Sequence, residues 1–334
     1  MGRSITSFIL LILVGSAHAQ QSALDTAASL TRNPAIYALL VAQHNNVKYE
    51  KYCNGKNAND LFNSQSLTKD VMSLLVGIAV NKGYIQSADE PLSRFFPSLL
   101  QDKDKRKQRV TIREVMNQAS GLWHEDLESL GGVKAYLDLP NPSQQVLTAE
   151  MVSNPADSFH YSNAVTHLLS VIITNTSGLT TRDFAQKYLF DPLGIQTYNW
   201  PEMKDGYYDG SGLLGLEMHT RDIYKIGQLV LQDGKYAGKQ VVPAAWIRQL
   251  KQPSRTYATA WGFEGSRYGL CWYHVKYENL ELQYGLGWGG QLLILIPSLD
   301  AVVVVHQDHT TPTAPRQTYR FIYGVFPMVL KLLQ

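Results

Sequence analysis

The chain has 334 residues, of which 45% are hydrophobic and 17% are charged, and its formal net charge at pH 7 is +2. This near balance of charge argues against nucleic acid or an anionic membrane surface as a partner, because both require a strongly basic patch. Two cysteines, Cys53 and Cys271, are too few for a disulfide scaffold and leave one bridge as the only pairing to consider. The length suits one large domain or two intimate lobes.

The first segment, residues 1–19, is predicted to be a secretory signal peptide. Arg3 gives it a basic start, residues 8–14 form a short apolar run, and Ala17-His18-Ala19 is a cleavage site of the small-x-small type. The apolar run is too short to span a bilayer, and no later stretch is long enough. We therefore expect an exported protein, periplasmic or secreted, that begins at or near Gln20, with no stable membrane span.

Strand patterns lie at both ends of the remaining chain and helix patterns lie between them. The predicted strands cover 36–43, 47–53, 268–276, 280–284, 290–297 and 301–307. The predicted helices cover 21–30, 66–82, 111–120, 164–175, 181–189, 220–231, 243–250 and 318–333. This order predicts an α+β fold in which both chain ends build one antiparallel sheet flanked by helices. Residues 20–60 and 255–334 would form the α/β lobe, and residues 61–254 an inserted, mainly helical lobe.

The helix that begins at Ser66-Leu67-Thr68-Lys69 is the first candidate for chemistry. From 71 to 80 it is apolar almost all round, which is typical of a buried helix, and Gly83 marks its end. Ser66 and Lys69 stand at i and i+3, so their side chains share one face. Burial lowers the pKa of a lysine, so a neutral Lys69 amine would accept the proton of a serine nucleophile. On the tetrad alone, the sequence favours a capping serine beside a solvated lysine.

Two later motifs supply the groups that a serine nucleophile needs. Tyr161-Ser162-Asn163 offers a phenol that can move a proton and an amide that can bind a substrate carbonyl. The segment Gly287-Trp288-Gly289-Gly290-Gln291 leads into a strand, and its glycines let a substrate lie against the backbone. A free N–H in this segment can then face an oxyanion.

Other motifs carry less weight. The loop 210–215, Gly-Ser-Gly-Leu-Leu-Gly, matches GxGxxG but lacks the βαβ context of a dinucleotide site, so we interpret it as a flexible wall of the cleft. The histidines are scattered, and His306 with His309 lacks an evident third ligand. We therefore expect no metal and no cofactor.

In this order, the motifs resemble those of the beta-lactamase-related serine hydrolases. That group includes class C beta-lactamases, D-alanyl-D-alanine peptidases, family VIII carboxylesterases and 6-aminohexanoate-oligomer hydrolases. The resemblance covers nearly the whole mature chain, through 67–70, 111–113, 119–122, 161–163, 190–195, 218–222 and 289–292. It implies that Ser66 is acylated, that Lys69 and Tyr161 form the base pair and that Asn163 orients the substrate. It also implies an oxyanion hole made by the N–H groups of Ser66 and Gln291.

The sequence departs from the lactamases and peptidases of this group at Trp288-Gly289-Gly290, where they carry Lys-Thr-Gly or a histidine variant. A lysine there helps to bind a substrate carboxylate, and an indole cannot. We therefore expect a serine hydrolase of carboxylic esters, or of amides without a free carboxylate. The alternatives are a weak class C-like beta-lactamase, a D-alanyl-D-alanine peptidase, or a protein that binds penicillin or cell-wall fragments without turnover. The oligomeric state is left open.

Overall fold

The computed structural model describes residues 19–28, 36–123, 125, 133–252, 255–256 and 262–334. The predicted signal peptide lies outside the described residues, apart from Ala19. Residues 19–28 are helical, and within them Leu24 and Ala28 are buried. The Tyr49 hydroxyl, on the sheet, donates a hydrogen bond to Asp25 at 2.8 Å. In the described part of the chain, no helix is long and apolar enough to cross a membrane.

The main sheet joins the two ends of the chain. Within the described residues it is antiparallel and has eight strands, in the order β2-β1-β13-β12-β11-β10-β9-β8. These strands are β1 (Ile36–Gln43), β2 (Asn46–Tyr52), β8 (Arg255–Thr256), β9 (Arg267–Gly269), β10 (Trp272–Tyr277), β11 (Leu280–Gly287), β12 (Gln291–Ile296) and β13 (Ala301–Gln307). The strands of the first hairpin are joined through His44 and Asn45, whose φ angles of 50° and 61° are those of a tight hairpin turn. The α+β fold, with its sheet built from both chain ends, is confirmed.

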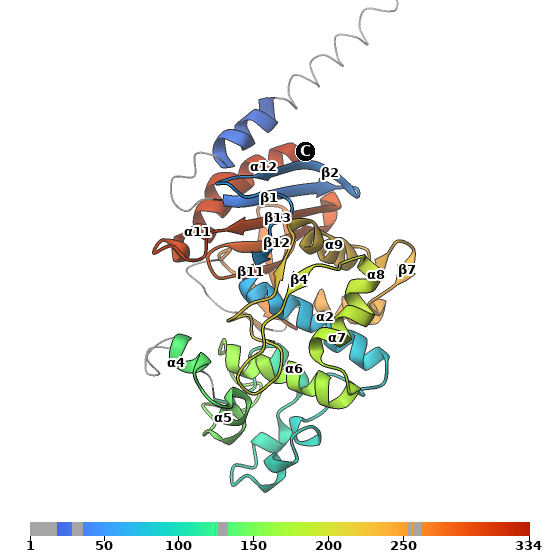
Figure 1. The fold of residues 1–334 in the computed structure, drawn as a ribbon, viewed down its shortest axis with the longest axis vertical. Coiled ribbons are helices and arrows are strands. Elements are labelled where there is room, and N and C mark those ends of the chain that lie inside the picture. Colours follow the sequence, from blue (N-terminus) through green and yellow to red (C-terminus); the bar gives the residue numbers. More distant parts are fainter. Residues whose placement is uncertain (1–18, 29–35, 124, 126–132, 253–254, 257–261) are drawn as a thin grey trace, which may run out of the picture.

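Helices fill the segment between these strands and cover both faces of the sheet (Figure 1). The α-helices are α2 (Thr68–Asn81), α3 (Ile112–Met116), α4 (Val133–Leu137), α5 (Pro142–Thr148), α6 (Asn163–Ser177), α7 (Thr181–Ala185), α8 (Asp191–Leu193), α9 (Thr220–Leu231), α10 (Ala244–Leu250), α11 (Ala314–Arg320) and α12 (Phe326–Leu333). The 3-10 turns are η1 (Gln65–Leu67), η2 (Leu92–Arg94), η3 (Pro97–Gln101), η4 (Lys107–Arg109) and η6 (Pro297–Leu299), and the π turns are η5 (Gln186–Phe190) and η7 (Phe321–Val325). Two small sheets complete the fold: β3 (Phe62–Asn63) with β5 (Glu217–Met218) and β4 (Tyr198–Asn199), and β6 (Lys235–Tyr236) with β7 (Lys239–Gln240).

Two sequence-based boundaries were wrong. The strand expected over 268–276 is two strands, β9 and β10, because the chain reverses at Leu270 and Cys271, where φ is 50° and 74°. No glycine or proline stands at 270–271 to signal that turn. The helix expected over 318–333 begins at Ala314 and passes through the π turn η7 before α12. Pro327, in the first turn of α12, has no N–H to continue the helical ladder.

Both cysteines are free. Cys53 follows β2 at one edge of the main sheet, whereas Cys271 lies in the β9–β10 turn near the opposite edge. The bridge that the sequence left open is therefore not formed.

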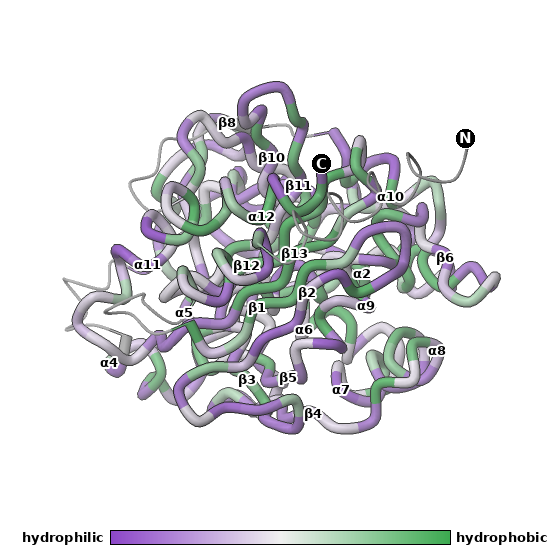
Figure 2. Tube along the Cα trace, turned by 90° about the horizontal axis from the view of Figure 1, so that it is seen from above, coloured by the Kyte–Doolittle hydropathy of each residue, from purple (hydrophilic) through white to green (hydrophobic). Residues whose placement is uncertain are grey.

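The sheet separates two hydrophobic clusters. The face of β12 and β13 that carries Leu293 and Val304 packs with α2, α6 and α9, and the opposite face, with Ile294 and Val303, packs with α12. In Figure 2 the central strands β1, β12 and β13 are mainly hydrophobic, and hydrophilic residues gather at the periphery. The alternation of strand side chains between two buried faces explains why these strands are almost continuously apolar.

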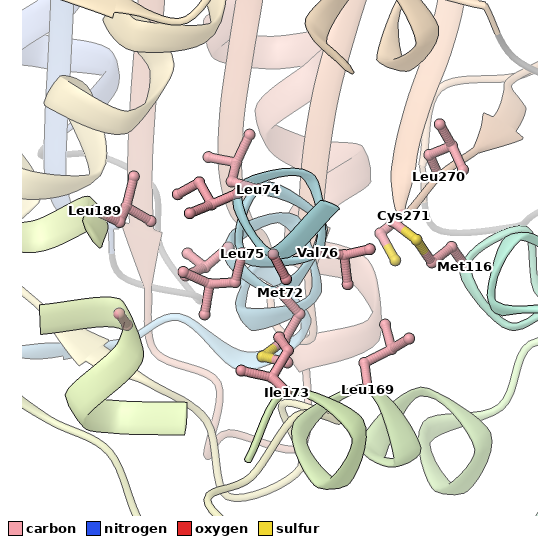
Figure 3. Close-up of a cluster of buried hydrophobic side chains, with 14 of the residues drawn as sticks. Met72, Leu74, Leu75, Val76, Met116, Leu169, Ile173, Leu189, Leu270 and Cys271 are labelled. Carbon is pink, nitrogen blue, oxygen red and sulfur yellow. The ribbon is translucent and has the colours of Figure 1, made fainter. Parts of the chain in front are cut away.

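Helix α2 is the centre of the larger cluster. Its residues 68–79 are all buried, and Figure 3 shows Met72, Leu75 and Val76 among side chains from α6 and the β9–β10 turn. Gly83, with φ of +78°, follows the end of the helix as predicted. A helix held on every side presents its first turn, which carries Lys69, in a fixed orientation.

Candidate active site

The candidate nucleophile Ser66 lies in the 3-10 turn η1, directly before α2. The residue before it, Gln65, has a φ of 50°, a left-handed conformation that is unfavourable for a residue with a side chain. Asn63 compensates for this strain, because its Oδ1 accepts hydrogen bonds from the Gln65 N and Nε2 atoms, each at 2.8 Å. Thr68 Oγ1 donates to the Gln65 carbonyl oxygen at 2.7 Å. The backbone at Ser66 is therefore strained and held from both sides.

Lys69 has one per cent of its surface exposed, and three oxygen atoms surround its Nζ atom. These are Ser66 Oγ at 3.1 Å, Asn163 Oδ1 at 2.7 Å and the carbonyl oxygen of Ser211. The two carbonyl oxygens can only accept, so two Nζ hydrogens are committed to them. The third position on Nζ faces Ser66 Oγ. This position holds a hydrogen when Lys69 is an ammonium and a lone pair when Lys69 is a neutral amine. In the amine form, Ser66 can therefore give its proton directly to Lys69.

Tyr161 and Asn163 reach this group from the start of α6. The Tyr161 ring centroid is 4.9 Å from Lys69 Nζ, a cation–π distance, and Asn163 accepts the Lys69 hydrogen bond described above. Ser162 lies between them and caps α6, because its Oγ accepts from the Val165 N–H at 3.0 Å. The cap turns the chain so that the residues on either side of Ser162 face Lys69. Four of the predicted residues, Ser66, Lys69, Tyr161 and Asn163, are thus brought together.

The loop 210–215 forms a wall of the site, and Asp209 holds it. The Asp209 carboxylate is fully buried and accepts from the N–H groups of Ser211, Gly212, Leu214 and Gly215, at 2.7, 3.1, 2.9 and 2.9 Å. Four backbone donors around one carboxylate fix the path of the loop. The loop in turn brings the Ser211 carbonyl oxygen to Lys69. The sequence analysis predicted the wall, but it missed Asp209 and the contact with Lys69.

A cavity of about 670 Å³ opens over Ser66. It is lined by Asn63, Gln65, Ser66, Tyr161, Asn163, Gly212, Leu213, Leu214, Trp288 and His309. Its wall combines amide groups with the two leucines and the Trp288 indole, which is 44% exposed. A large aromatic side chain that lines a cavity and is also half-exposed is free to contact a bound molecule. His309 is a lining residue that the sequence analysis did not assign to the site.

Gly289, Gly290 and Gln291 do not line this cavity within the described part of the chain. The β11–β12 hairpin turns at 287–290, where the Gly290 N–H donates to the Gly287 carbonyl oxygen at 3.2 Å. The turn leaves Trp288 at the cavity and carries the following residues away from it. The Gln291 side chain is buried and donates to the Gln307 carbonyl oxygen at 2.7 Å. Trp288 is therefore the residue of the 288–291 segment that lines the cavity, and the role predicted for Gly289, Gly290 and Gln291 stays a prediction.

Two ionisable groups near the site have shifted pKa values. Burial raises the pKa of the Asp70 carboxyl well above its usual range, because the effect of burial outweighs the opposing effect of the Lys69 charge. Burial lowers the pKa of His309, against the opposing effects of Asp308 and Glu217. Burial therefore favours the neutral form of the Asp70 carboxyl, and it favours the uncharged form of His309 near neutral pH. Among the described residues, no group of three or more His, Cys, Asp or Glu side chains is placed to hold a metal ion.

Comparison with known proteins identifies the family. Residues 34–322 match the family model described as Beta-lactamase. The chain belongs to the Beta-lactamase family. The fold is similar to that of a solved structure, the hydrolase EstCE1, which is described as having promiscuous acyltransferase activity. The two superpose with a TM-score of 0.72 at 15% identity, covering 92% of this chain and 100% of that one.

Two curated relatives place the chain more closely within the Beta-lactamase family. The 6-aminohexanoate-dimer hydrolase of Paenarthrobacter ureafaciens is 26% identical over 286 residues, which is 80% of this chain and 71% of that protein. A penicillin-binding protein of Bacillus subtilis (strain 168) is 30% identical over 166 residues, 46% of this chain but only 34% of that protein. These likenesses confirm the resemblance to the beta-lactamase-related serine hydrolases.

Proposed function

We propose that this protein hydrolyses carboxylic esters, or amides without a free carboxylate, through an acyl-enzyme on Ser66. The observation that carries the proposal is the environment of Lys69, in which two carbonyl oxygens fix the amine and its third position faces Ser66 Oγ. A nucleophile with a base in hydrogen-bond contact, and a third group that orients the base, is the arrangement that activates a serine hydroxyl. A protein that only binds a ligand has no need of it.

In the first half of the reaction, the Ser66 hydroxyl proton moves to the Lys69 amine while Oγ attacks the substrate carbonyl carbon. The Tyr161 phenol gives a proton to the departing alkoxide or amine and regains one from Lys69, so the acyl-enzyme forms and the alcohol or amine leaves. Water then attacks the ester carbonyl of the acyl-enzyme, with Lys69 and Tyr161 acting in reverse. The carboxylic acid is released and Ser66 recovers its proton.

The negative charge on the tetrahedral intermediate requires preorganised N–H donors. We assign one of them to the backbone of Ser66. For the second we favour the N–H of Trp288 over that of Gln291, because Trp288 lines the cavity and follows the end of β11 that packs against η1. A Cβ atom added at Gly287 would lie 3.0 Å from the Gln65 Cβ atom, so this end of β11 lies directly against the Ser66 turn.

The preference for uncharged substrates follows from the cavity wall. Lys69 is already engaged with three oxygens, and His309, because of its lowered pKa, carries no charge near neutral pH. Among the described residues that line it, the cavity therefore offers a substrate carboxylate no free cation, whereas its leucines and indole suit an apolar acyl or alcohol group. A weak beta-lactamase or peptidase activity is the second candidate, favoured by the likeness to a penicillin-binding protein.

The test is a steady-state assay of a short-chain p-nitrophenyl ester beside a chromogenic cephalosporin. We expect ester turnover with a burst of p-nitrophenol and Ser66 acylated in the intact mass. The variant Ser66→Ala should lose both, whereas Ser73→Ala, which removes a buried hydroxyl with no hydrogen-bond partner among the described residues, should retain them. Cephalosporin turnover exceeding ester turnover would favour the second candidate, and one equivalent of product without turnover would indicate a binding protein.

Export after signal cleavage is part of the same proposal. We expect the protein recovered from an expressing bacterium to begin at Gln20 or within two residues of it. An exported protein that retains Met1 would contradict the proposed cleavage.

A further inference from the structure

We propose that Glu125 is a positioning residue for the acid–base group, which holds Tyr161 and Asn163 against Lys69. The inference rests on the proposed function, since it assigns Glu125 to the same catalytic group. Glu125 does not line the cavity, and neither its position in the sequence nor any motif distinguishes it.

The Glu125 side chain is buried, with 7% of the residue exposed, and both of its carboxylate oxygens bind the start of α6. Oε1 accepts from the Asn163 N–H at 2.6 Å. Oε2 accepts from the Ser162 hydroxyl at 3.0 Å and from the Ala164 N–H at 3.1 Å. Hydrogen bonds to a charged acceptor are the stronger kind, and these three converge on consecutive residues.

These contacts lead directly to the nucleophile. The Asn163 backbone binds Glu125, its side chain binds Lys69 at 2.7 Å, and Lys69 in turn lies 3.1 Å from Ser66 Oγ. Gln118 holds the same segment from the other side, because its Oε1 accepts from the Ser162 N–H at 2.6 Å. Tyr161 directly precedes the residues that Glu125 and Gln118 hold. A shift of this segment would move Tyr161 and Asn163 at the same time, and both of these residues contact Lys69.

Glu125 also contributes charge. All three partners of Lys69 are uncharged oxygens, so no carboxylate in direct contact compensates an ammonium there. The Tyr136 side chain is buried, and after burial itself the charge of Glu125 is the largest cause of its raised pKa, followed by the charges of Asp209 and Asp205. A buried negative charge beside a proton-transfer group favours the protonated form of that group. Removal of the Glu125 charge should therefore move the acid limb of the rate profile to lower pH.

The experiment measures the rate at which a fluorophosphonate labels Ser66 in the full-length mature protein. Labelling is detected by intact mass spectrometry, and the rate is measured from pH 5 to pH 9. Ser66 Oγ attacks phosphorus and fluoride leaves, so the rate reports the activation of Ser66 whichever ester or amide is the substrate. The variants are Glu125→Gln, which keeps the size and loses the charge, and Glu125→Asp, which keeps the charge but is too short to reach all three donors. Glu90→Gln is the matched control, because Glu90 is equally buried at 7%, also accepts a backbone N–H and lies outside the cavity wall.

We expect Glu125→Gln to slow labelling at pH 7 by about 10- to 100-fold and to move the acid limb down by roughly one pH unit. Glu125→Asp should also slow labelling but leave the acid limb where it is in the wild type. Glu90→Gln should match the wild type in both. If Glu125 only stabilised the start of α6, its loss would lower the unfolding temperature without moving the acid limb of the rate profile.

A Glu125→Gln variant with wild-type labelling rate and pH profile would overturn the inference. If Glu125→Gln does not fold, Glu125→Asp decides: a wild-type rate in that variant would overturn it, and a slower rate with an unmoved limb would support it. The proposed function fails separately, if wild-type protein labelled rapidly at Ser66 does not turn over p-nitrophenyl esters.

Discussion

Gly212 lies against the backbone of Gln65, the residue before the proposed nucleophile. A Cβ atom at position 212 would overlap the Gln65 carbonyl oxygen and would lie 2.9 Å from the Ser66 Cα atom. Gly212 also has a φ of +80°, which a residue with a side chain rarely adopts. The wall of the cavity and the nucleophile turn are therefore in contact through a position that only glycine can fill.

We expect Gly212→Ala to reduce ester turnover by at least about tenfold, because the loop or the Ser66 turn must move to accept the methyl group. Gly238→Ala is the control, since Gly238 has a similar φ of +78° but nothing within 4 Å of an added Cβ atom. Both variants carry the backbone strain, of order 1 kcal/mol, and should lose similar thermal stability from it. Equal turnover in the two variants would show that the contact with Gln65 is unimportant for catalysis.

The part of the site that could be predicted from the sequence is the part built from side chains in short motifs. Ser66 and Lys69 share a helix turn, and Tyr161 and Asn163 flank a helix cap, so local spacing fixes their relative positions. The path of the hairpin from Trp288 to Gln291 depends on its turn and could not be predicted from spacing. Trp288 remains at the cavity while Gln291, three residues later, is buried beside Gln307.

Asp209 and Glu125 could not be predicted in the same way. Most of their partners are backbone N–H groups, which every residue except proline possesses, so no pattern of residue types marks the contact. His309 follows the last strand of the sheet and lies against Gly289, the neighbour of Trp288, where an added Cβ atom would be 2.5 Å from the His309 Cα atom. Such approaches between distant segments are a property of the folded chain.

Lys69 and Tyr161 should behave as one proton-transfer unit. We expect Lys69→Ala and Tyr161→Phe each to reduce kcat/KM for a p-nitrophenyl ester by at least about 10²-fold. Because each group depends on the other, the double variant should be barely slower than either single variant. Steady-state kinetics of the three variants test this. Losses that multiply in the double variant would indicate that the two residues act in separate steps.

Asp70 should make the protein less stable as the pH rises. Its raised folded-state pKa means that, above the unfolded value near 4, the folded protein keeps a proton that the unfolded chain releases. The free energy of unfolding therefore falls by about 1.4 kcal/mol for each pH unit up to the folded-state pKa. The neutral variant Asp70→Asn removes this titration, so its stability advantage over the wild type should grow between pH 5 and pH 8.

Denaturant unfolding at several pH values measures that advantage. Asp209→Asn is the contrasting variant, because its carboxylate accepts four backbone hydrogen bonds and its loss should destabilise the protein throughout this range. A constant difference between Asp70→Asn and the wild type from pH 5 to pH 8 would mean that Asp70 is charged in the folded protein.

Trp288 is the residue that most directly tests the proposed substrate class. Its indole is 44% exposed and lines the cavity, so it can stack on an apolar acyl or alcohol group but offers a carboxylate no charge. We expect Trp288→Lys to slow turnover of short-chain p-nitrophenyl esters and to raise the relative activity on carboxylate-bearing beta-lactams. A hydrogen bond to a charged group contributes about 1.5–3 kcal/mol, which corresponds to a relative gain of about tenfold or more.

The matched control for Trp288→Lys is Tyr319→Lys, which adds the same cation at an aromatic residue that is 55% exposed and lies outside the cavity wall. This variant should leave the ratio of ester to beta-lactam turnover unchanged, because a cation outside the cavity cannot contact the substrate carboxylate. The ratio, measured at one pH for both variants and the wild type, cancels any general loss of Ser66 activation. A folded Trp288→Lys variant with an unchanged ratio would remove Trp288 from substrate selection, and the acid–base roles of Lys69 and Tyr161 would be unaffected.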